Sequence, residues 1–300
     1  MTIQYDNTLG QWAEDARLFA SRPSENNEAV LTLIVCDFEY SYDRDRHAGY
    51  LVAEGKAAER KIRWPFHRIA AASWLVLRFT PGKTVPEFEE PVVMTGESAT
   101  EKQMVEAFFD ACRAEPDAIL TTWGGEAKDM AVLRAAAMMH GLVLPAQLVD
   151  LHPHSRHRLD LCQATSVAAT SVHLPEFAQA LCIPSKPSAS NDIGPAVNSG
   201  DWTLVAEQVL ADVVTTTVIA LWQLAALGQV TIDRGTTLLT LSERLKKSLP
   251  SSAFCTRTFA QWGRARHAEA GLRGTIFRAP STTPTALRGH STKQSEGELA

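Results

Sequence analysis

The 300-residue sequence lacks any pairing pattern among its cysteines. There are five, which is an odd number, and none is spaced as Cys-x-x-Cys. Scattered thiols of this kind predict neither a disulfide framework nor a thiolate zinc site. The five are Cys36, Cys112, Cys162, Cys182 and Cys255.

The sequence also lacks an uninterrupted apolar run of the length that spans a membrane, and residues 1–6 lack the basic and then apolar character of a secretion signal. We therefore expect no membrane association and a cytoplasmic protein. A content of 45% hydrophobic and 21% charged residues is that of an ordinary globular chain. Three hundred residues suffice for one large domain or two small ones.

The charge is distributed unevenly, although the net value is only −5. From Glu243 onward there are ten Lys and Arg against four Glu, a local charge of +6, which leaves −11 for residues 1–242. An acidic main body argues against a general nucleic-acid clamp, whereas the basic C-terminal part is able to attract phosphate.

A run of strand length, residues 31–40 (LTLIVCDFEY), carries two carboxylates near its end. Side chains alternate along a strand, so Asp37 and Glu39 share one face with Val35. If that face is buried, two ionised carboxylates are costly unless a cation compensates, and hard divalent ions prefer such oxygens. The alternative is that the strand ends at Cys36 and both carboxylates are solvated. The pair alone favours this alternative.

The following elements predict a mixed α/β domain. Residues 41–63 are polar and predict an irregular surface loop, while 67–79 and 88–94 predict two further strands separated by a Pro-Gly turn. A helix opens near Ser98, where a capping pattern precedes an apolar stripe. A strand at 117–122 and a helix at 126–140, ended by Gly141, complete this part.

The longest predicted helix runs from Asp201 to about Leu227, and Asp212 lies on its apolar stripe. An aspartate in that position is either a hydrogen-bonded structural residue or a third metal ligand, and the helix alone does not separate the two. The long loop before it, residues 184–200, is typical of a functional segment, and Lys186 within it is a candidate phosphate contact.

Taken together, Asp37-x-Glu39, Asp129 and Asp212 stand in an order that resembles the DEDD superfamily of 3′–5′ exonucleases. More narrowly, residues 30–223 resemble the predicted exonucleases related to the proofreading domain of bacterial family-B DNA polymerases. The most specific part is residues 119–135 (ILTTWGGEAKDMAVLRA), and two more segments are similar to family motifs: RLDL at 158–161 and IPSK at 183–186.

The resemblance implies a ribonuclease-H-like mixed sheet flanked by helices, and a hydrolase that uses two Mg²⁺ or Mn²⁺ ions. It implies that Asp37 bridges both ions, that Glu39 and Asp212 complete one site, and that Asp129 holds the other through water. The implied substrate is the 3′ end of single-stranded DNA or RNA. The implied substrate-binding residues are Phe38, Trp123, Gly124, Gly125 and Lys186.

Two motifs depart from the family pattern. Gln208 stands where members usually carry a tyrosine that orients the attacking water, and Gly124 and Lys128 replace the usual Asn and Phe of the second motif. An amide can hydrogen-bond a water but cannot act as a base near neutral pH. We therefore hold two hypotheses: an exonuclease in which Gln208 belongs to the catalytic set, and a catalytically weak nucleic-acid-binding protein on the same fold.

Three parts are predicted along the chain. Residues 1–29 form an N-terminal extension that includes a short helix at 11–20, residues 30–232 form the exonuclease-like domain, and residues 233–300 form a basic C-terminal extension that is partly disordered. Residues 238–249 within that extension have the pattern of one more amphipathic helix.

Overall fold

The computed structural model describes residues 29–152 and 155–276. The expected helix at 11–20 and the expected disorder after residue 279 lie outside these ranges. Six strands form one mixed sheet in the order β3-β2-β1-β5-β6, with β4 also paired to β2. The pairs β1–β2, β2–β3 and β2–β4 are antiparallel, whereas β1–β5 and β5–β6 are parallel. The strands are β1 (Leu31–Tyr42), β2 (His67–Phe79), β3 (Glu87–Phe88), β4 (Val92–Thr95), β5 (Ile119–Thr122) and β6 (Arg158–Asp160).

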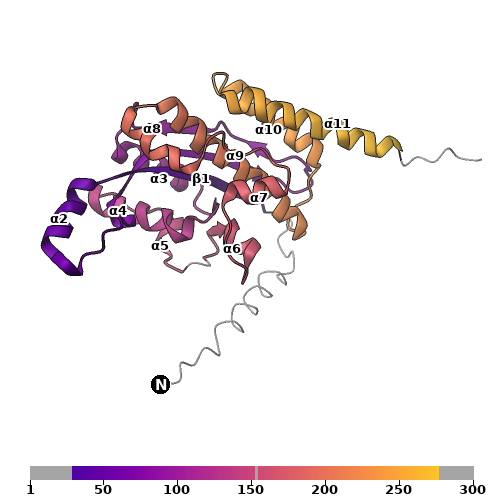
Figure 1. Ribbon diagram of the computed structural model, residues 1–300. Helices are drawn as coiled ribbons and strands as arrows, with labels where there is room; N and C mark the ends of the chain where they lie inside the picture. The colour runs from indigo at the N-terminus through magenta and orange to yellow at the C-terminus, as the bar shows by residue number, and fades with distance from the viewer. Residues whose placement is uncertain (1–28, 153–154, 277–300) are drawn as a thin grey trace, which may run out of the picture.

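Helices cover both faces of the sheet, which confirms the predicted fold class. Figure 1 shows α9 and α10 on one side of β1 and α4 and α5 on the other. The α-helices are α2 (Arg44–Glu54), α3 (Glu101–Ala114), α4 (Asp129–His140), α5 (Ala146–Val149), α6 (Leu161–Ser166), α7 (Leu174–Ala180), α8 (Ile193–Ser199), α9 (Trp202–Ala226), α10 (Arg234–Ser248) and α11 (Ala260–Ile276), with a π-helical turn at Phe254–Phe259.

The alternation of β1 divides the core into two layers. Leu33 and Val35 pack against α9 and α10, whereas Ile34 and Cys36 pack against α3 and α4. All four side chains are buried, and a buried side chain of Leu or Val size contributes about 1.5–3 kcal/mol. The next residues on the α9 face are Asp37 and Glu39, so the same alternation carries two carboxylates toward α9.

Helix α9 is buried nearly all round, not along a single stripe as the sequence predicts. By length and hydropathy it would also suit a membrane span, but 78% of its apolar window is buried inside the protein, as in the core helix of a soluble fold. Asp201 caps its N-terminus by accepting a hydrogen bond from Leu204 N–H, and this fixes where the helix begins.

Three local predictions need correction. Residues 44–54, expected to be irregular, form α2, whose first turn is capped by Asp43 and whose His47 packs on Phe66. The expected strand at 88–94 is split into β3 and β4, because Pro91 has no N–H for a ladder. The N-cap of α3 is Thr100, which forms a capping box with Gln103, instead of Ser98.

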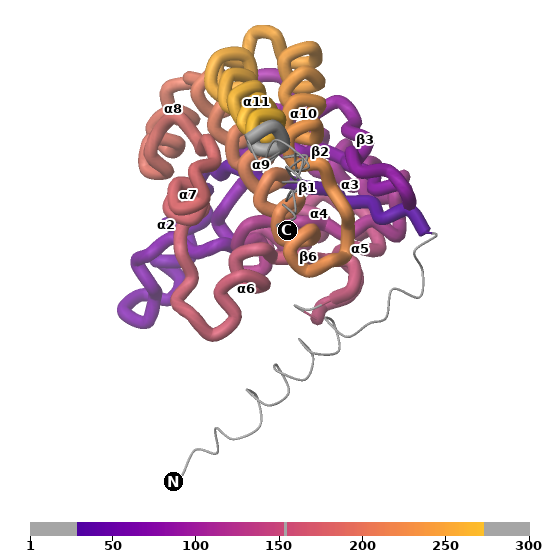
Figure 2. The backbone as a smooth tube through the Cα atoms, turned by 90° about the vertical axis from the view of Figure 1, so that its right-hand side faces the viewer, coloured from indigo at the N-terminus to yellow at the C-terminus, as the bar shows by residue number. Residues whose placement is uncertain are grey.

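The C-terminal helices are continuous with the main core. Leu238, Leu241 and Leu245 of α10 and Phe259 of the π-helical turn belong to the same buried cluster as Leu33. Figure 2 shows α10 and α11 side by side next to α9. Helix α10 confirms the amphipathic helix predicted at 238–249, while the domain boundary at residue 232 stays a prediction.

Candidate metal centre

Strand β1 and helix α9 bring three carboxylates together. Asp37 and Glu39 come from β1 and Asp212 comes from the middle of α9, and one ligand oxygen from each lies within 4.8 Å of the others. We call these three residues the carboxylate triad. Alternation on a strand and the 3.6-residue period of a helix place them on facing surfaces. The solvated-strand-end alternative for Asp37 and Glu39 therefore does not describe the structure.

A β-bulge lies next to the triad. The register of β1 against β2 shifts between Glu39 and Tyr40, where Ala70 of β2 is left without a partner on β1. Bulges bend a strand and re-aim its side chains, and they are frequent beside active sites. Beyond the bulge Tyr40 returns to the α4 face of the sheet, where it is buried.

Lys186 neutralises one member of the triad. Its ammonium lies 3.0 Å from Asp212 Oδ2, and both side chains are nearly buried, with 10% and 8% exposure. Predicted as a phosphate contact, Lys186 is thus found as the ion-pair partner of a candidate metal ligand. The second oxygen, Asp212 Oδ1, is buried and has no hydrogen-bond partner in the part of the chain that the structure describes.

The loop that carries Lys186 is fastened along α9 by alternate residues. We call residues 184–188 the strap. The strap runs antiparallel to α9, so that later strap residues contact earlier residues of the helix. Thr215 Oγ1 donates to the Pro184 carbonyl (2.8 Å). Lys186 pairs with Asp212, and Ser188 hydrogen-bonds to Gln208.

Gln208 is fully buried and uses both ends of its amide on the strap. Ser188 Oγ donates to Gln208 Oε1 (2.8 Å), and Gln208 Nε2 donates to the Ser188 carbonyl (3.0 Å). This corrects the expectation that Gln208 faces a water beside Asp212. The physical reason is that a buried amide needs partners at both ends, and Ser188 supplies them.

Asp129 lies at the first position of α4 and is not part of the triad. Tyr40 donates its hydroxyl to Asp129 Oδ1 (2.6 Å), and Lys128 Nζ lies 3.9 Å from the same oxygen. Its charge nevertheless reaches the triad, because it raises the pKa of Asp37. The fourth predicted ligand is therefore near the other three but engaged by partners of its own.

The second motif forms a tight turn held by Asp160. Gly124 has a left-handed backbone (φ 74°), and its N–H donates to Asp160 Oδ1 (2.8 Å), while Glu126 N–H donates to Oδ2 (3.1 Å). Asp160 also caps α6. Gly125 is buried so close to Thr122 that a Cβ would lie 2.5 Å from its hydroxyl. The glycines thus serve the turn itself, and the Gly124 N–H is not free for a substrate.

The aromatic residues predicted to bind substrate have different surroundings. Phe38 is 2% exposed and packs edge-on against Phe108, on the face opposite the carboxylates. Strand alternation therefore removes Phe38 from the site, which corrects the expected substrate contact. Trp123 is half-buried on Phe177, and its indole N–H donates to the Val172 carbonyl (3.2 Å).

The ionisation of the triad is strongly perturbed. Burial raises the pKa of Asp37 well above its usual value, and the charges of Asp212 and Glu39 raise it further. Burial and the charge of Asp212 raise the pKa of Glu39 to about 7, against the opposing effect of Lys186. Burial also raises the pKa of Asp212, although Lys186 lowers it. Three carboxylates in this setting attract a cation strongly.

The donor set fits a hard divalent ion. The triad offers only carboxylate oxygens, and Asp212 Oδ1 is a buried acceptor without a partner among the described residues. Mg²⁺ and Mn²⁺ prefer such oxygens, whereas no His or Cys belongs to the group. The triad is therefore a candidate centre for either ion.

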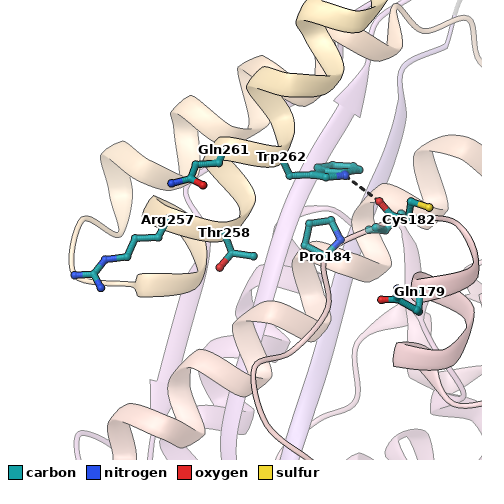
Figure 3. Close-up of a pocket in the computed structure, with 8 residues that line it drawn as sticks. Gln179, Cys182, Pro184, Arg257, Thr258, Gln261 and Trp262 are labelled. Carbon is teal, nitrogen blue, oxygen red and sulfur yellow. Dashed lines mark hydrogen bonds between the residues drawn. The ribbon is translucent and has the colours of Figure 1, made fainter.

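A surface hollow lies apart from the triad. It has a volume of about 670 Å³ and is lined by residues of α7, of the segment 182–184 that leads into the strap, of the π-helical turn and of α11. Figure 3 shows Trp262 reaching across it, where the indole N–H donates to the Cys182 carbonyl (2.9 Å). No carboxylate lines it, so the hollow has no part in the metal centre.

Two residues that organise the site were not predicted from the sequence as functional. Ser188 is one of several polar residues in a Pro- and Ser-rich loop, and nothing local distinguishes it. Tyr40 carries a local signal, since it ends the strand of Asp37 and Glu39, but its partner Asp129 is 89 residues away. Both act through contacts between distant segments.

Comparison with known proteins gives a family match and distant structural likenesses. A family model described as a predicted 3′–5′ exonuclease related to the exonuclease domain of PolB matches residues 60–261, a range that contains Asp129, Gln208 and Asp212 but not Asp37 or Glu39. A search of curated protein sequences gave no match.

The structure resembles that of the family B DNA polymerase from the hyperthermophilic archaeon Pyrobaculum calidifontis, with a TM-score of 0.46 and 14% identity. The alignment covers 72% of this chain but only 29% of that polymerase. So distant a likeness says nothing about activity.

Proposed function

Because the chain belongs to the family of predicted 3′–5′ exonucleases related to the exonuclease domain of PolB, we propose that it hydrolyses phosphodiester bonds at the 3′ ends of single-stranded nucleic acids with the help of divalent ions. One observation carries the proposal: oxygens of Asp37, Glu39 and Asp212 lie within 4.8 Å of one another in a largely buried setting. Such a cluster is costly without a cation and matches the ligands of Mg²⁺ and Mn²⁺.

In the proposed site, Asp37, Glu39 and Asp212 would hold one ion, and Asp37 together with Asp129 would hold a second. Such ions, when bound, supply a more acidic water and offset the charge of the scissile phosphate. To bind the second ion, Asp129 must either coordinate it while it still accepts the hydrogen bond from Tyr40, or give up that hydrogen bond.

The side chains around the triad limit which group can accept the proton of the attacking water. Gln208 is an amide bound at both ends to Ser188, so it does not take the proton of the attacking water. No described side chain at the triad other than a carboxylate is available for that role, because Lys186 is held as a cation by Asp212. The half-buried ring of Trp123 is the proposed contact to the terminal nucleotide, while the ammonium of Lys186 stays paired with Asp212.

The second candidate is a nucleic-acid-binding protein of the same fold with weak or no cleavage. Two observations favour it. The amide of Gln208 is hydrogen-bonded to the strap, and the carboxylate of Asp129 interacts with Tyr40 and Lys128. In this case the basic C-terminal part supplies the attraction to phosphate, and binding is salt-dependent. We keep the cytoplasm as the expected location for both candidates.

The test uses 5′-labelled single-stranded DNA and RNA oligonucleotides with Mn²⁺ or Mg²⁺, and a duplex as the comparison. The proposal predicts stepwise shortening from the 3′ end, abolished by EDTA. Asp37→Ala should lower the rate more than about 100-fold, because even outer partners of metal ligands cost 10–100-fold. Asp45→Ala, an exposed aspartate on α2, is the matched control.

Shortening that is as fast in Asp37→Ala as in Asp45→Ala would show a contaminating nuclease and reject the proposal. Salt-dependent binding of the labelled strands without any shortening, unchanged in Asp37→Ala, would support the second candidate instead. Replacing the exposed Arg257 and Arg264 by Gln, which leaves the buried Phe259 in place, then tests whether the basic part is the contact.

A further inference from the structure

Lys186 is a cation built into the candidate metal centre. Its ammonium lies 3.0 Å from Asp212 Oδ2, and its charge also lowers the pKa of Glu39. The side chain is only 10% exposed, so water screens the interaction little. In the metal-free protein this one buried ammonium offsets part of the repulsion among three carboxylates.

The strap restricts the movement of Lys186 away from Asp212. Thr215 holds the carbonyl of Pro184, two residues before Lys186, and Gln208 holds Ser188, two residues after it. Two residues span at most about 7 Å, so both anchors lie within that distance of the Lys186 backbone. Fixing the backbone on both sides lowers the entropy that Lys186 loses when it pairs with Asp212.

The position of Lys186 opposes any other cation at the triad. A divalent ion bound by Asp212 Oδ1 would share its carboxylate with the ammonium on Oδ2. Two like charges a few Å apart repel each other strongly where the effective dielectric constant is near 20. This repulsion is large enough to weaken the binding of a divalent ion by at least tenfold. Asp212 sits in the middle of a buried helix, so removing its partner would change its orientation little.

We propose that Lys186 is the resident counter-cation of the carboxylate triad, and that Ser188 and Gln208 are positioning residues that hold it there. The strap thereby sets how tightly a divalent ion binds. This inference rests on the proposed function in one respect only, namely that the triad binds a divalent ion. In this inference Gln208 positions the strap that carries Lys186, instead of orienting a water.

The experiment measures Mn²⁺ binding by calorimetry and thermal unfolding with EDTA or Mn²⁺. Lys186→Met should bind Mn²⁺ about tenfold more tightly than the wild type, while it unfolds at a lower temperature in EDTA. Its stabilisation by Mn²⁺ is therefore larger than in the wild type. Lys186→Arg keeps the charge and should keep wild-type affinity.

Ser188→Ala tests the positioning role without changing any charge. Because it removes one hydrogen bond that positions Lys186 but keeps the ammonium itself, it should tighten Mn²⁺ binding less than Lys186→Met does, by about threefold. Lys83→Met is the matched control, since Lys83 pairs with Glu87 in the turn before β3, outside the triad. Its Mn²⁺ affinity should equal that of the wild type.

Unchanged or weaker Mn²⁺ binding in Lys186→Met would overturn the inference, as would a complete absence of Mn²⁺ binding in the wild type. If Lys186→Met does not fold in EDTA, the Ser188→Ala variant decides. An Mn²⁺ affinity of Ser188→Ala equal to that of Lys83→Met would show that the strap does not influence Mn²⁺ binding. Cleavage plays no part in these measurements. A protein that binds Mn²⁺ as expected but never shortens an oligonucleotide would reject the proposed function and keep this inference.

Discussion

The hydroxyl of Tyr40 donates a 2.6 Å hydrogen bond to Oδ1 of Asp129, and this bond joins the end of β1 to the start of α4. Lys128 completes the arrangement, with its Nζ 4.3 Å from the centre of the Tyr40 ring. Asp129 is buried, so its carboxylate depends on these two partners. The fourth predicted ligand is thus part of a small network on the α4 face of the sheet.

Tyr40→Phe should lower the free energy of unfolding by about 1–3 kcal/mol, because it leaves a buried carboxylate with one partner fewer. It should also raise the pKa of Asp129 above its present value of about 6, since the Tyr40 bond lowers that pKa. Urea unfolding and carboxyl-carbon NMR measure the two effects. Tyr42→Phe, at the exposed end of the same strand, is the control, and equal losses in both variants would contradict the role given to Tyr40.

The metal-free protein should become less stable as the pH rises from about 4.5 to about 7. The pKa of Glu39 is raised from 4.5 to about 7 in the folded state, so in this window the unfolded chain has lost its proton while the folded chain retains it. Stability then falls with pH, by up to about 3 kcal/mol for this group. Urea unfolding in EDTA at several pH values measures the slope.

Saturating Mn²⁺ should reverse that slope. With an ion bound, the carboxylates of the triad stay ionised in the folded state at lower pH than in the unfolded chain, so stability falls as the pH falls. Asp212→Asn should abolish the reversal, because it removes a charged ligand from the triad. The same slope with and without Mn²⁺ in the wild type would show that the triad does not bind the ion.

Two neighbouring glycines should differ in their tolerance of alanine. Gly124 is left-handed but faces open space, so Gly124→Ala should cost about 1–2 kcal/mol from backbone strain. At Gly125 the new Cβ would lie 2.7 Å from the Cβ of Thr122, which is buried on β5. Gly125→Ala should therefore cost about 3 kcal/mol through overpacking. Urea unfolding compares the two, and an equal or smaller loss at Gly125 would contradict the reading of this turn.

Arg158→Met should be among the most damaging substitutions. The Arg158 side chain is 1% exposed, pairs with Glu126 (2.5 Å), and donates to the Gln147 carbonyl (2.9 Å). Its loss leaves a buried carboxylate unpaired and should cost about 3–5 kcal/mol. The double variant with Glu126→Gln should recover part of that loss in thermal unfolding, because the unpaired charge is then removed. No recovery would mean that the carbonyl contacts matter more than the ion pair.

Periodicity made much of the fold predictable. The apolar stripe predicted to follow Ser98 is the buried side of α3, from Met104 to Cys112, and the bounds of β2 and α9 agree closely with the predicted 67–79 and 201–227. Alternation also predicted that Asp37 and Glu39 share a face. Where apolar periodicity is weak, as in residues 41–63, the sequence did not predict α2, which rests on its Asp43 cap and on packing against Phe66.

The sequence by itself determined which residue types reach the α9 face of β1 and the apolar side of α9, because strand and helix periods are local properties of the chain. Only the tertiary structure decided what each polar group does there. Ser188 rather than a water meets Gln208, Lys186 meets Asp212, and Tyr40 donates to Asp129. A buried polar group takes whichever partner folding brings within hydrogen-bond distance, and those partners lie 20 to 89 residues away in the chain.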